Sequence, residues 1–213
     1  MIRDPETLAA LRDGVARFVR DRLIPNEAIV ADTDAVPESI IAEMRALGLF
    51  GLSIPEAFGG LGLTMEEEVV VAFELGRTSP AFRSLLGTNN GIGSQGLVFD
   101  GTPEQKARYL PRLASGELIA SFALTEPGSG SDAASLSTSA RRDGDHYVLN
   151  GTKRYITNAP EAGVFTVMAR TDPAEKGAHG ISAFIVERAT PGLALGKLDR
   201  KMGQRGAHTC DVI

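Results

Sequence analysis

Hydrophobic residues recur at helical spacing along the first half of the chain. Steps of three and four residues predict one amphipathic helix that begins at Pro5 and has its apolar face over Leu8–Val19, and another from Pro37 to Leu47. Asp4 is the expected N-cap of the first helix, and Gly48 is expected to end the second. The apolar positions concerned are Leu8, Leu11, Val15, Phe18 and Val19, followed by Ile40, Ile41, Met44 and Leu47.

Two capping boxes predict where further helices begin. Thr64–Glu67 and Thr102–Gln105 each place a threonine three residues before a glutamate or glutamine, so that both side chains can bond the free N–H groups of a first turn. The first box leads into Val69–Phe73, whose nearly all-round apolarity predicts a central, buried helix. The second opens a helix that is expected to end near Ser115–Gly116.

The apolar period changes to two from Ile119 onward, which is typical of β-strands. Arg142–Asp145 has the composition of a hairpin turn. We therefore predict an α+β fold, with an all-α helical domain over residues 1–117 and an antiparallel, β-barrel-like domain over residues 118–213. The run Cys210–Ile213 has no turn behind it, so the β domain is expected to be incomplete in this chain. The predicted strands are 119–124, 135–140, 146–149, 164–170 and 181–186.

Composition excludes several classes of protein. Of the 213 residues, 43% are hydrophobic and 23% charged, which argues against both a disordered chain and a membrane-spanning one. The net charge of −5, without a long basic run, argues against nucleic acid as a partner. The single cysteine, Cys210, fits a reducing compartment and a small packed side chain. Because the N-terminus resembles neither a secretion signal nor a transit peptide, we expect a cytoplasmic protein.

The segment Phe122–Asp132 concentrates the candidate chemistry. A predicted strand leads into Pro127–Gly128, whose turn leaves backbone N–H groups free to bind a polar ligand. Three interpretations compete: a purely structural loop, a ligand-binding loop, and a dinucleotide fingerprint built on Gly128, Gly130 and Ala133. The fingerprint requires a helix directly afterwards. The residues that follow alternate as in a strand, which argues against it.

Several motifs together resemble the acyl-CoA dehydrogenase family, and the resemblance covers nearly the whole chain. Ala123–Ser135 is similar to the first signature of that family. Asn150–Ala159 is similar to its second flavin-contacting segment, and Lys201–Arg205 to a stretch of its middle domain. Gly48–Gly62 is typical of its first domain.

The resemblance implies FAD as cofactor and an acyl-CoA as substrate. It implies that Phe122, Ala123, Leu124 and Thr125 line the flavin, with Gly130 and Ser131 nearby, and that Tyr155, Ile156 and Thr157 cover its other side. Many relatives have tyrosine at position 122 and tryptophan at position 155, so Phe122 and Tyr155 are conservative departures. Ser131, Asn89 and Gly91 are the expected substrate contacts. Thr88–Ser94 has two interpretations, as a wall of the acyl-chain pocket or as a helix-packing contact.

The resemblance also implies that the general base is a glutamate in a C-terminal helical bundle, so no catalytic residue is expected within residues 1–213. Glu126 is therefore rejected as the base. Lys153–Arg154 and Arg200–Lys201 are either contacts for CoA phosphates or solvated charges. His146, His179 and His208 have no spacing that suits a metal, and no metal site is predicted.

The expected partners are an electron-transfer flavoprotein and further copies of the same chain, in a tetramer or dimer. Neither a membrane nor a nucleic acid is expected. Two alternatives stay open. The first is an acyl-CoA oxidase or a related flavoenzyme on the same scaffold, in which oxygen accepts the electrons. The second is a catalytically inactive fragment that binds flavin or acyl-CoA.

Overall fold

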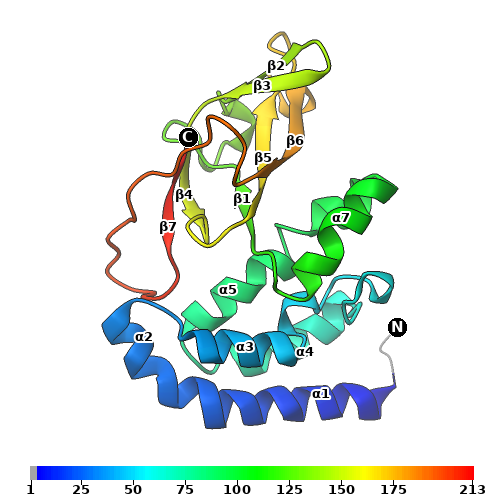
Figure 1. The fold of residues 1–213 in the computed structure, drawn as a ribbon, viewed down its shortest axis with the longest axis vertical. Coiled ribbons are helices and arrows are strands. Elements are labelled where there is room, and N and C mark those ends of the chain that lie inside the picture. The colour runs from blue at the N-terminus through cyan, green and yellow to red at the C-terminus, as the bar shows by residue number, and fades with distance from the viewer. Residues whose placement is uncertain (1–3) are drawn as a thin grey trace. The chain divides into compact units, whose positions relative to one another are not determined.

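The computed structural model describes residues 4–213 and divides the chain into two compact units. The helical unit comprises Met1–Ile119 together with Lys201–Ala207, and the β unit comprises Ala120–Arg200 together with His208–Ile213. The predicted α+β class, with a helical N-terminal part, is confirmed (Figure 1). Among the described residues, no helix is long and apolar enough to cross a membrane.

Local sequence signals account for the main helices of the first unit. The Asp4 carboxylate accepts hydrogen bonds from the backbone N–H groups of Glu6 and Thr7, as predicted for the N-cap. Both predicted capping boxes are present, at the starts of α4 and α7. The helices are α1 (Pro5–Phe18), α2 (Glu27–Thr33), α3 (Glu38–Ala46), α4 (Met65–Leu75), α5 (Pro80–Asn90), α6 (Gln95–Asp100) and α7 (Pro103–Ala114).

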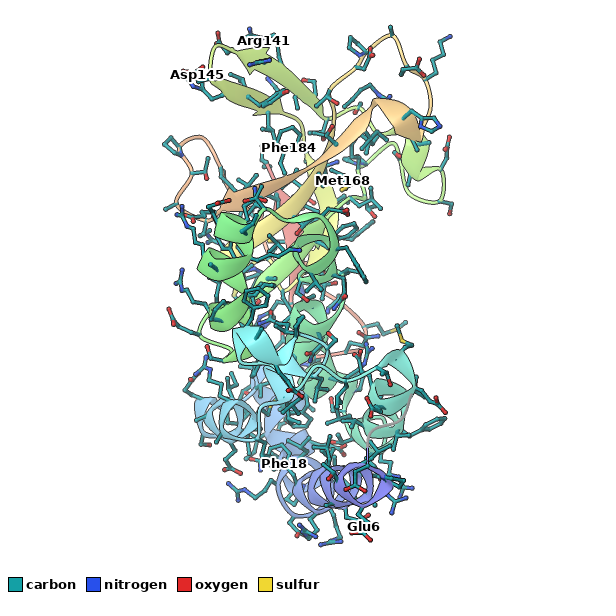
Figure 2. All side chains as sticks on the ribbon, turned by 90° about the vertical axis from the view of Figure 1, so that its right-hand side faces the viewer. Glu6, Phe18, Arg141, Asp145, Met168 and Phe184 are labelled. Atoms are coloured by element: carbon teal, nitrogen blue, oxygen red, sulfur yellow. The ribbon has the colours of Figure 1, made fainter. Side chains whose placement is uncertain are left out.

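The helical unit encloses a hydrophobic core to which α1, α3, α4 and α5 contribute. Phe18 lies on the side of α1 that faces the other helices, whereas Glu6 points away from them (Figure 2). The segment 201–207 joins this core through Ala207, and Gly206 donates its N–H to the Asp34 carboxylate at 2.6 Å. Leu23, Ile40, Met44, Leu49, Phe50 and Phe82 are among its fully buried side chains.

One helix prediction was wrong. The apolar run of α4 predicted a central helix, yet only the face that carries Glu67, Val71 and Leu75 is buried. Phe73 on the opposite face is 74% exposed, and Met65 and Val69 are exposed beside it. The other elements of the helical unit cover a single side of α4, so its remaining apolar residues face outward.

The β unit contains a mixed sheet and a separate strand pair. The larger sheet has the order β1-β5-β2-β3, and β6 pairs with β5 on its own. Figure 1 shows β5 and β6 side by side. The strands are β1 (Ala120–Ala123), β2 (Ser139–Asp143), β3 (His146–Asn150), β4 (Lys153–Thr157), β5 (Val164–Arg170), β6 (Ile181–Glu187) and β7 (Thr209–Val212).

The predicted antiparallel, barrel-like arrangement is not confirmed. β1 runs parallel to β5 in register from Ala120 opposite Val164 to Ala123 opposite Val167, and the sheet is not closed. β4 and β7 form their own antiparallel pair. The parallel pairing joins strands about forty residues apart in sequence, which local alternation does not reveal.

The predicted hairpin is present, but the strand before it begins later than expected. β2 and β3 pair from Ser139 opposite Asn150 to Asp143 opposite His146, around a turn in which Gly144 has a φ of +62°. Figure 2 shows Arg141 and Asp145 at the outer end of this hairpin. Residues 135–138 are not part of the strand, because a short 3₁₀ turn over Ala133–Ser135 precedes it.

Candidate functional site

The two segments that were expected to contact the cofactor lie side by side in the β unit. The Ser121 hydroxyl in β1 donates to the carbonyl oxygen of Thr157 in β4 at 2.6 Å. Just beyond β1, the Thr125 carbonyl accepts a hydrogen bond of 2.7 Å from the N–H of Arg154. We use the name cradle for Phe122–Thr125, Gly130–Ser131 and Tyr155–Thr157.

A β-bulge in β4 determines which side chains the cradle presents. The register with β7 shifts between Lys153 and Ile156, and Tyr155 within the bulge has a φ of +59°. Residues 153 and 156 would face opposite sides of a regular strand. Here both are buried, and Tyr155 between them is 63% exposed. The bulge thus directs a large aromatic ring outward while its neighbours stay in the core.

Arg154 supports the exposed ring of Tyr155. Its guanidinium lies 4.4 Å from the ring centroid, at cation–π distance. Asp211 and Asp199 hold the same guanidinium at 2.7 and 3.0 Å. The hydrogen bond that Arg154 donates to the Asp211 carboxylate, followed by the contact with Tyr155, raises the pKa of Arg154, which therefore stays charged. Arg154 was expected either to bind a CoA phosphate or to be solvated; it pairs with aspartates instead.

The other cradle residues differ in how much of their side chain is available. Phe122, Leu124, Thr125 and Thr157 are partly exposed, and Gly130 and Ser131 are exposed on the loop after Pro127. Ala123 and Ile156 belong to the core of the β unit, so only their backbone groups can face a ligand. The structure thus brings the β1 and β4 segments together and places side chains of both at the surface.

Glu126 and Lys153 form a buried ion pair directly behind the cradle. The Glu126 Oε1 to Lys153 Nζ distance is 2.8 Å, and each side chain is only 3% exposed. Glu126 also accepts hydrogen bonds from the N–H and hydroxyl of Ser137 at 2.6 and 2.7 Å, and from the N–H of Thr138 at 2.9 Å. Lys153 donates a further bond to the carbonyl oxygen of Leu124 at 3.1 Å.

The ionisation of this pair follows from its surroundings. Burial alone would raise the pKa of Glu126, but the hydrogen bonds from Lys153, Thr138 and Ser137 together lower it to about 2. Burial lowers the pKa of Lys153, and the Glu126 carboxylate opposes that shift. A carboxylate held so firmly in its ionised form is a poor proton acceptor near neutral pH. The geometry therefore agrees with the rejection of Glu126 as a general base.

The ion pair corrects the expectation for Lys153, which is neither a solvated charge nor exposed to a CoA phosphate. The signal that could have indicated it is the distance of three residues between Lys153 and the apolar Ile156, which fits two inward positions only if the strand contains a bulge. The partner, Glu126, is 27 residues away in sequence, so the pairing itself could not be read from local pattern.

The predicted substrate contacts lie at the end of α5. Asn89 is fully buried, and its side-chain amide donates to the carbonyl oxygens of Leu113 at 2.9 Å and Leu118 at 2.8 Å. It thus ties α5 to the end of α7, in line with the packing interpretation of this segment. Gly91 is half-buried and ends α5. Since Asn89 has no exposed surface in this conformation, its burial does not support the predicted substrate role, which stays a prediction.

The described residues contain no group of three His, Cys, Asp or Glu side chains placed to hold a metal ion. His146 and His179 are exposed, and His208 pairs with Glu161. Cys210 is buried in the core of the β unit, where burial raises the pKa of its thiol. This is the packed position expected for it.

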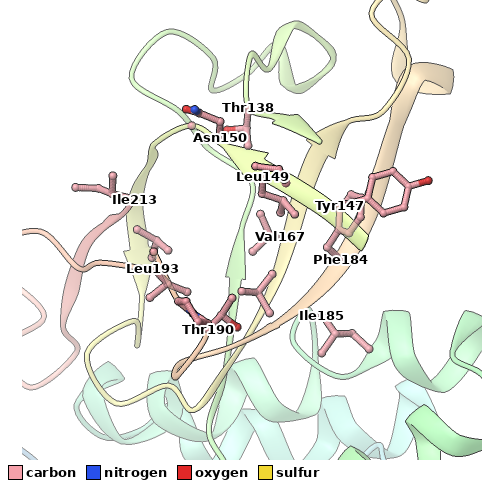
Figure 3. Close-up of a pocket in the computed structure, with 16 residues that line it drawn as sticks. Thr138, Tyr147, Leu149, Asn150, Val167, Phe184, Ile185, Thr190, Leu193 and Ile213 are labelled. Carbon is pink, nitrogen blue, oxygen red and sulfur yellow. The ribbon is translucent and has the colours of Figure 1, made fainter. Parts of the chain in front are cut away.

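A separate apolar pocket of about 490 Å³ opens in the β unit (Figure 3). Leu149, Val167, Phe184 and Leu193 contribute to its walls, and the rings of Tyr147 and Phe184 meet edge to face with centroids 5.3 Å apart. The pocket contains none of the residues predicted to bind cofactor or substrate.

Comparison with known proteins agrees with the motifs. The family model of the acyl-CoA dehydrogenase N-terminal domain matches residues 5–117, and that of the acyl-CoA dehydrogenase middle domain matches residues 121–213. The chain belongs to the acyl-CoA dehydrogenase family. It is 41% identical over 203 residues to an acyl-CoA dehydrogenase of Bacillus subtilis, a match that covers 95% of this chain and 53% of that protein.

Two solved structures of the acyl-CoA dehydrogenase fold are informative. One is a glutaryl-CoA dehydrogenase from Mycobacterium smegmatis in complex with FADH2, which is 33% identical to this chain with a TM-score of 0.86. The aligned region covers 99% of this chain and 53% of that protein. The other is the prolyl acyl carrier protein oxidase AnaB, which is 32% identical with a TM-score of 0.90. The aligned region covers 99% of this chain and 56% of that protein. The chain spans about half the length of the curated relatives it matches.

Proposed function

We propose that the intact protein that carries this sequence is a FAD-dependent acyl-CoA dehydrogenase. The observation that supports this most directly is the cradle: two segments, far apart in sequence, are joined by hydrogen bonds, and they carry an exposed aromatic ring and several partly exposed polar side chains. The similarity to a dehydrogenase solved with FADH2 supports flavin as the ligand.

The residues of the cradle fit a flat, electron-accepting ring system. The ring of Tyr155 offers a flat surface. The Arg154 guanidinium packs against this ring and is held in place by two aspartates. Thr125 and Thr157 each place a hydroxyl on a partly exposed side chain. Such donors stabilise charge that develops on a bound ring because they are oriented before the reaction begins. Bound FAD would supply the two-electron acceptor for the hydride that leaves the β carbon of the thioester.

Proton removal from the α carbon requires a base, and the described residues that form the cradle include no carboxylate or imidazole. Glu126 is committed to Lys153, Ser137 and Thr138. We propose, from the family resemblance, that the base belongs to another part of the intact protein. For the same reason we expect residues 1–213 alone to be inactive.

The electron acceptor and the assembly belong to the proposal as well. We infer an electron-transfer flavoprotein as acceptor and a homo-oligomeric enzyme, and the cytoplasmic location stays a prediction. A second candidate function is an oxidase, because a protein of this fold with a TM-score of 0.90 is an acyl carrier protein oxidase. In that case oxygen would accept the electrons, and the thioester could be carried by a protein instead of CoA.

One experiment tests the proposal and separates the two candidates. The intact protein is purified, its flavin absorbance is recorded, and butyryl-CoA, isovaleryl-CoA and glutaryl-CoA are added without oxygen. Loss of the flavin absorbance with one of them supports acyl-CoA oxidation, and hydrogen peroxide measured per turnover in air identifies an oxidase. A protein that binds no flavin would refute the proposal. Thr157→Ala should slow flavin reduction with substrate binding largely kept.

A further inference from the structure

Burial of the Glu126–Lys153 pair costs hydration free energy, and the hydrophobic core of the β unit does not require a charged pair. Two charges removed from water lose their hydration, and such pairs frequently contribute nothing to net stability compared with apolar side chains. In some proteins such a pair specifies a single geometry, and this is the hypothesis for Glu126 and Lys153. What the pair specifies can be read from its hydrogen bonds.

The Glu126 carboxylate joins both ends of the loop that carries Gly130 and Ser131. Glu126 itself lies at the start of the loop, and its oxygens accept bonds from Ser137 and Thr138 at the end. These contacts span eleven and twelve residues, so the carboxylate closes the loop at its base.

Lys153 connects the same point to β4. Its ammonium bonds both the Glu126 carboxylate and the Leu124 carbonyl, so the first residue of β4 is attached to the segment that follows β1. The ladder between β4 and β7 is interrupted between Lys153 and Ile156. The position of the bulge that presents Tyr155 therefore depends on bonds to the β1 side, where Arg154 also donates to Thr125.

We propose that the Glu126–Lys153 pair is a positioning device that sets the three parts of the cradle relative to one another. The pair touches neither ring nor substrate in this role, and it acts through Leu124, Ser137, Thr138 and β4. The inference rests on the proposed function, since it assigns a purpose to the cradle as a flavin site. It makes the pair a determinant of FAD affinity, as supporting residues behind a binding shell commonly are.

The test uses the intact protein freed of FAD, with the double variant Glu126→Gln/Lys153→Met. Both replacements keep the side-chain length and remove both charges, so neither leaves an unpaired buried ion. Two quantities are measured: the Kd for FAD from a fluorescence titration, and amide hydrogen exchange in the FAD-free protein. Glu43→Gln, which breaks the surface pair with Arg22 in the helical unit, is the matched control.

The expected result for the double variant is a Kd for FAD raised about tenfold or more. Hydrogen exchange should accelerate in residues 121–126 and 153–157 and stay unchanged in β5 and β6. Glu43→Gln should match the wild type. An unchanged Kd overturns the inference, and so does exchange accelerated throughout the β unit, because the pair would then be only structural. If the double variant does not fold, Glu126→Asp is judged by the same two criteria.

The design also separates failure of the inference from failure of the proposed function. If the wild-type protein binds no FAD, the proposed function is wrong and the inference falls with it. If the wild type binds FAD and the double variant binds it equally well, only the positioning role is refuted.

Discussion

Replacement of Asn89 by alanine distinguishes a packing role from a substrate role. In the structure, the Asn89 amide donates to the carbonyl oxygens of Leu113 and Leu118 from a fully buried position. Asn89→Ala leaves the Leu118 carbonyl without its donor, at about 1–3 kcal/mol. The Leu113 carbonyl loses one donor but still accepts from the N–H of Gly116 at 3.2 Å, so its loss is smaller, about 1 kcal/mol. We therefore expect a loss of about 2–4 kcal/mol in the free energy of unfolding of the helical unit.

Thermal unfolding of the intact protein, followed by circular dichroism, measures this loss. For a domain of this size, the expected loss corresponds to a fall of roughly 5–15 °C in the melting temperature. Asn26→Ala is the matched control, since the Asn26 amide also donates to one backbone carbonyl, that of Arg22, but near the surface. Its melting temperature should change by no more than about 2 °C.

Kinetics on the same variants provide the refutation. If Asn89→Ala leaves the melting temperature unchanged but raises KM for the acyl-CoA severalfold, Asn89 binds substrate and the packing argument is wrong. If both quantities change, Asn89→Leu is informative because it fills the space without hydrogen bonds. A KM restored by leucine would exclude a polar contact between Asn89 and the substrate.

Three further predictions concern the β unit. Because the pKa of Glu126 is lowered to about 2, its carboxylate should contribute about 3 kcal/mol above pH 4.5, a contribution lost as the pH falls through 2. Denaturant unfolding between pH 7 and pH 2 should show a steeper loss of stability in the wild type than in Glu126→Gln/Lys153→Met, which leaves no unpaired buried ion. Gly151→Ala would place a Cβ in collision with the Thr138 side chain and backbone and should lower the melting temperature by several degrees, unlike Gly177→Ala, which meets nothing within 4 Å. Tyr155→Ala should weaken FAD binding about tenfold in a fluorescence titration, and unchanged binding would remove the ring from the cradle.

The elements that could be predicted from sequence are those specified by neighbouring residues. The N-cap at Asp4 and the box at Thr64 depend on side chains that bond the backbone within three positions. The hairpin around Gly144 is similarly local, since its turn residues lie between the strands they join. For these features, all the groups that interact lie within a few residues of one another in the sequence.

Features that depend on distant partners could not be predicted. The sequence of α4 does not reveal which side its neighbours cover, so Phe73 was expected inside and is exposed. The parallel pairing of β1 with β5 depends on the fold of the intervening chain. Lys153 was expected at the surface because its partner, Glu126, lies in another element.

The candidate cradle was found by motif, and its individual contacts remain predictions. The sequence motifs predicted that the regions around Phe122 and Tyr155 serve one site, and this stays a prediction. Hydrogen bonds from β1 and from Thr125 just after it join the first region to β4. The bulge that exposes Tyr155 and the arginine beneath its ring were missed. Neither leaves a signal in the alternation of apolar and polar residues, because a bulge breaks that alternation.

The positive φ of Tyr155 has a consequence for protein engineering. A residue with a Cβ in the left-handed region costs on the order of 1 kcal/mol, and glycine or asparagine would fit that backbone better. A procedure that selects only for stability would therefore tend to replace Tyr155, and the replacement would remove the ring that the bulge presents. Position 155 is thus a place where stability and activity are expected to conflict. A library of variants at this single position, sorted once by melting temperature and once by flavin content, should rank the amino acids in opposite orders.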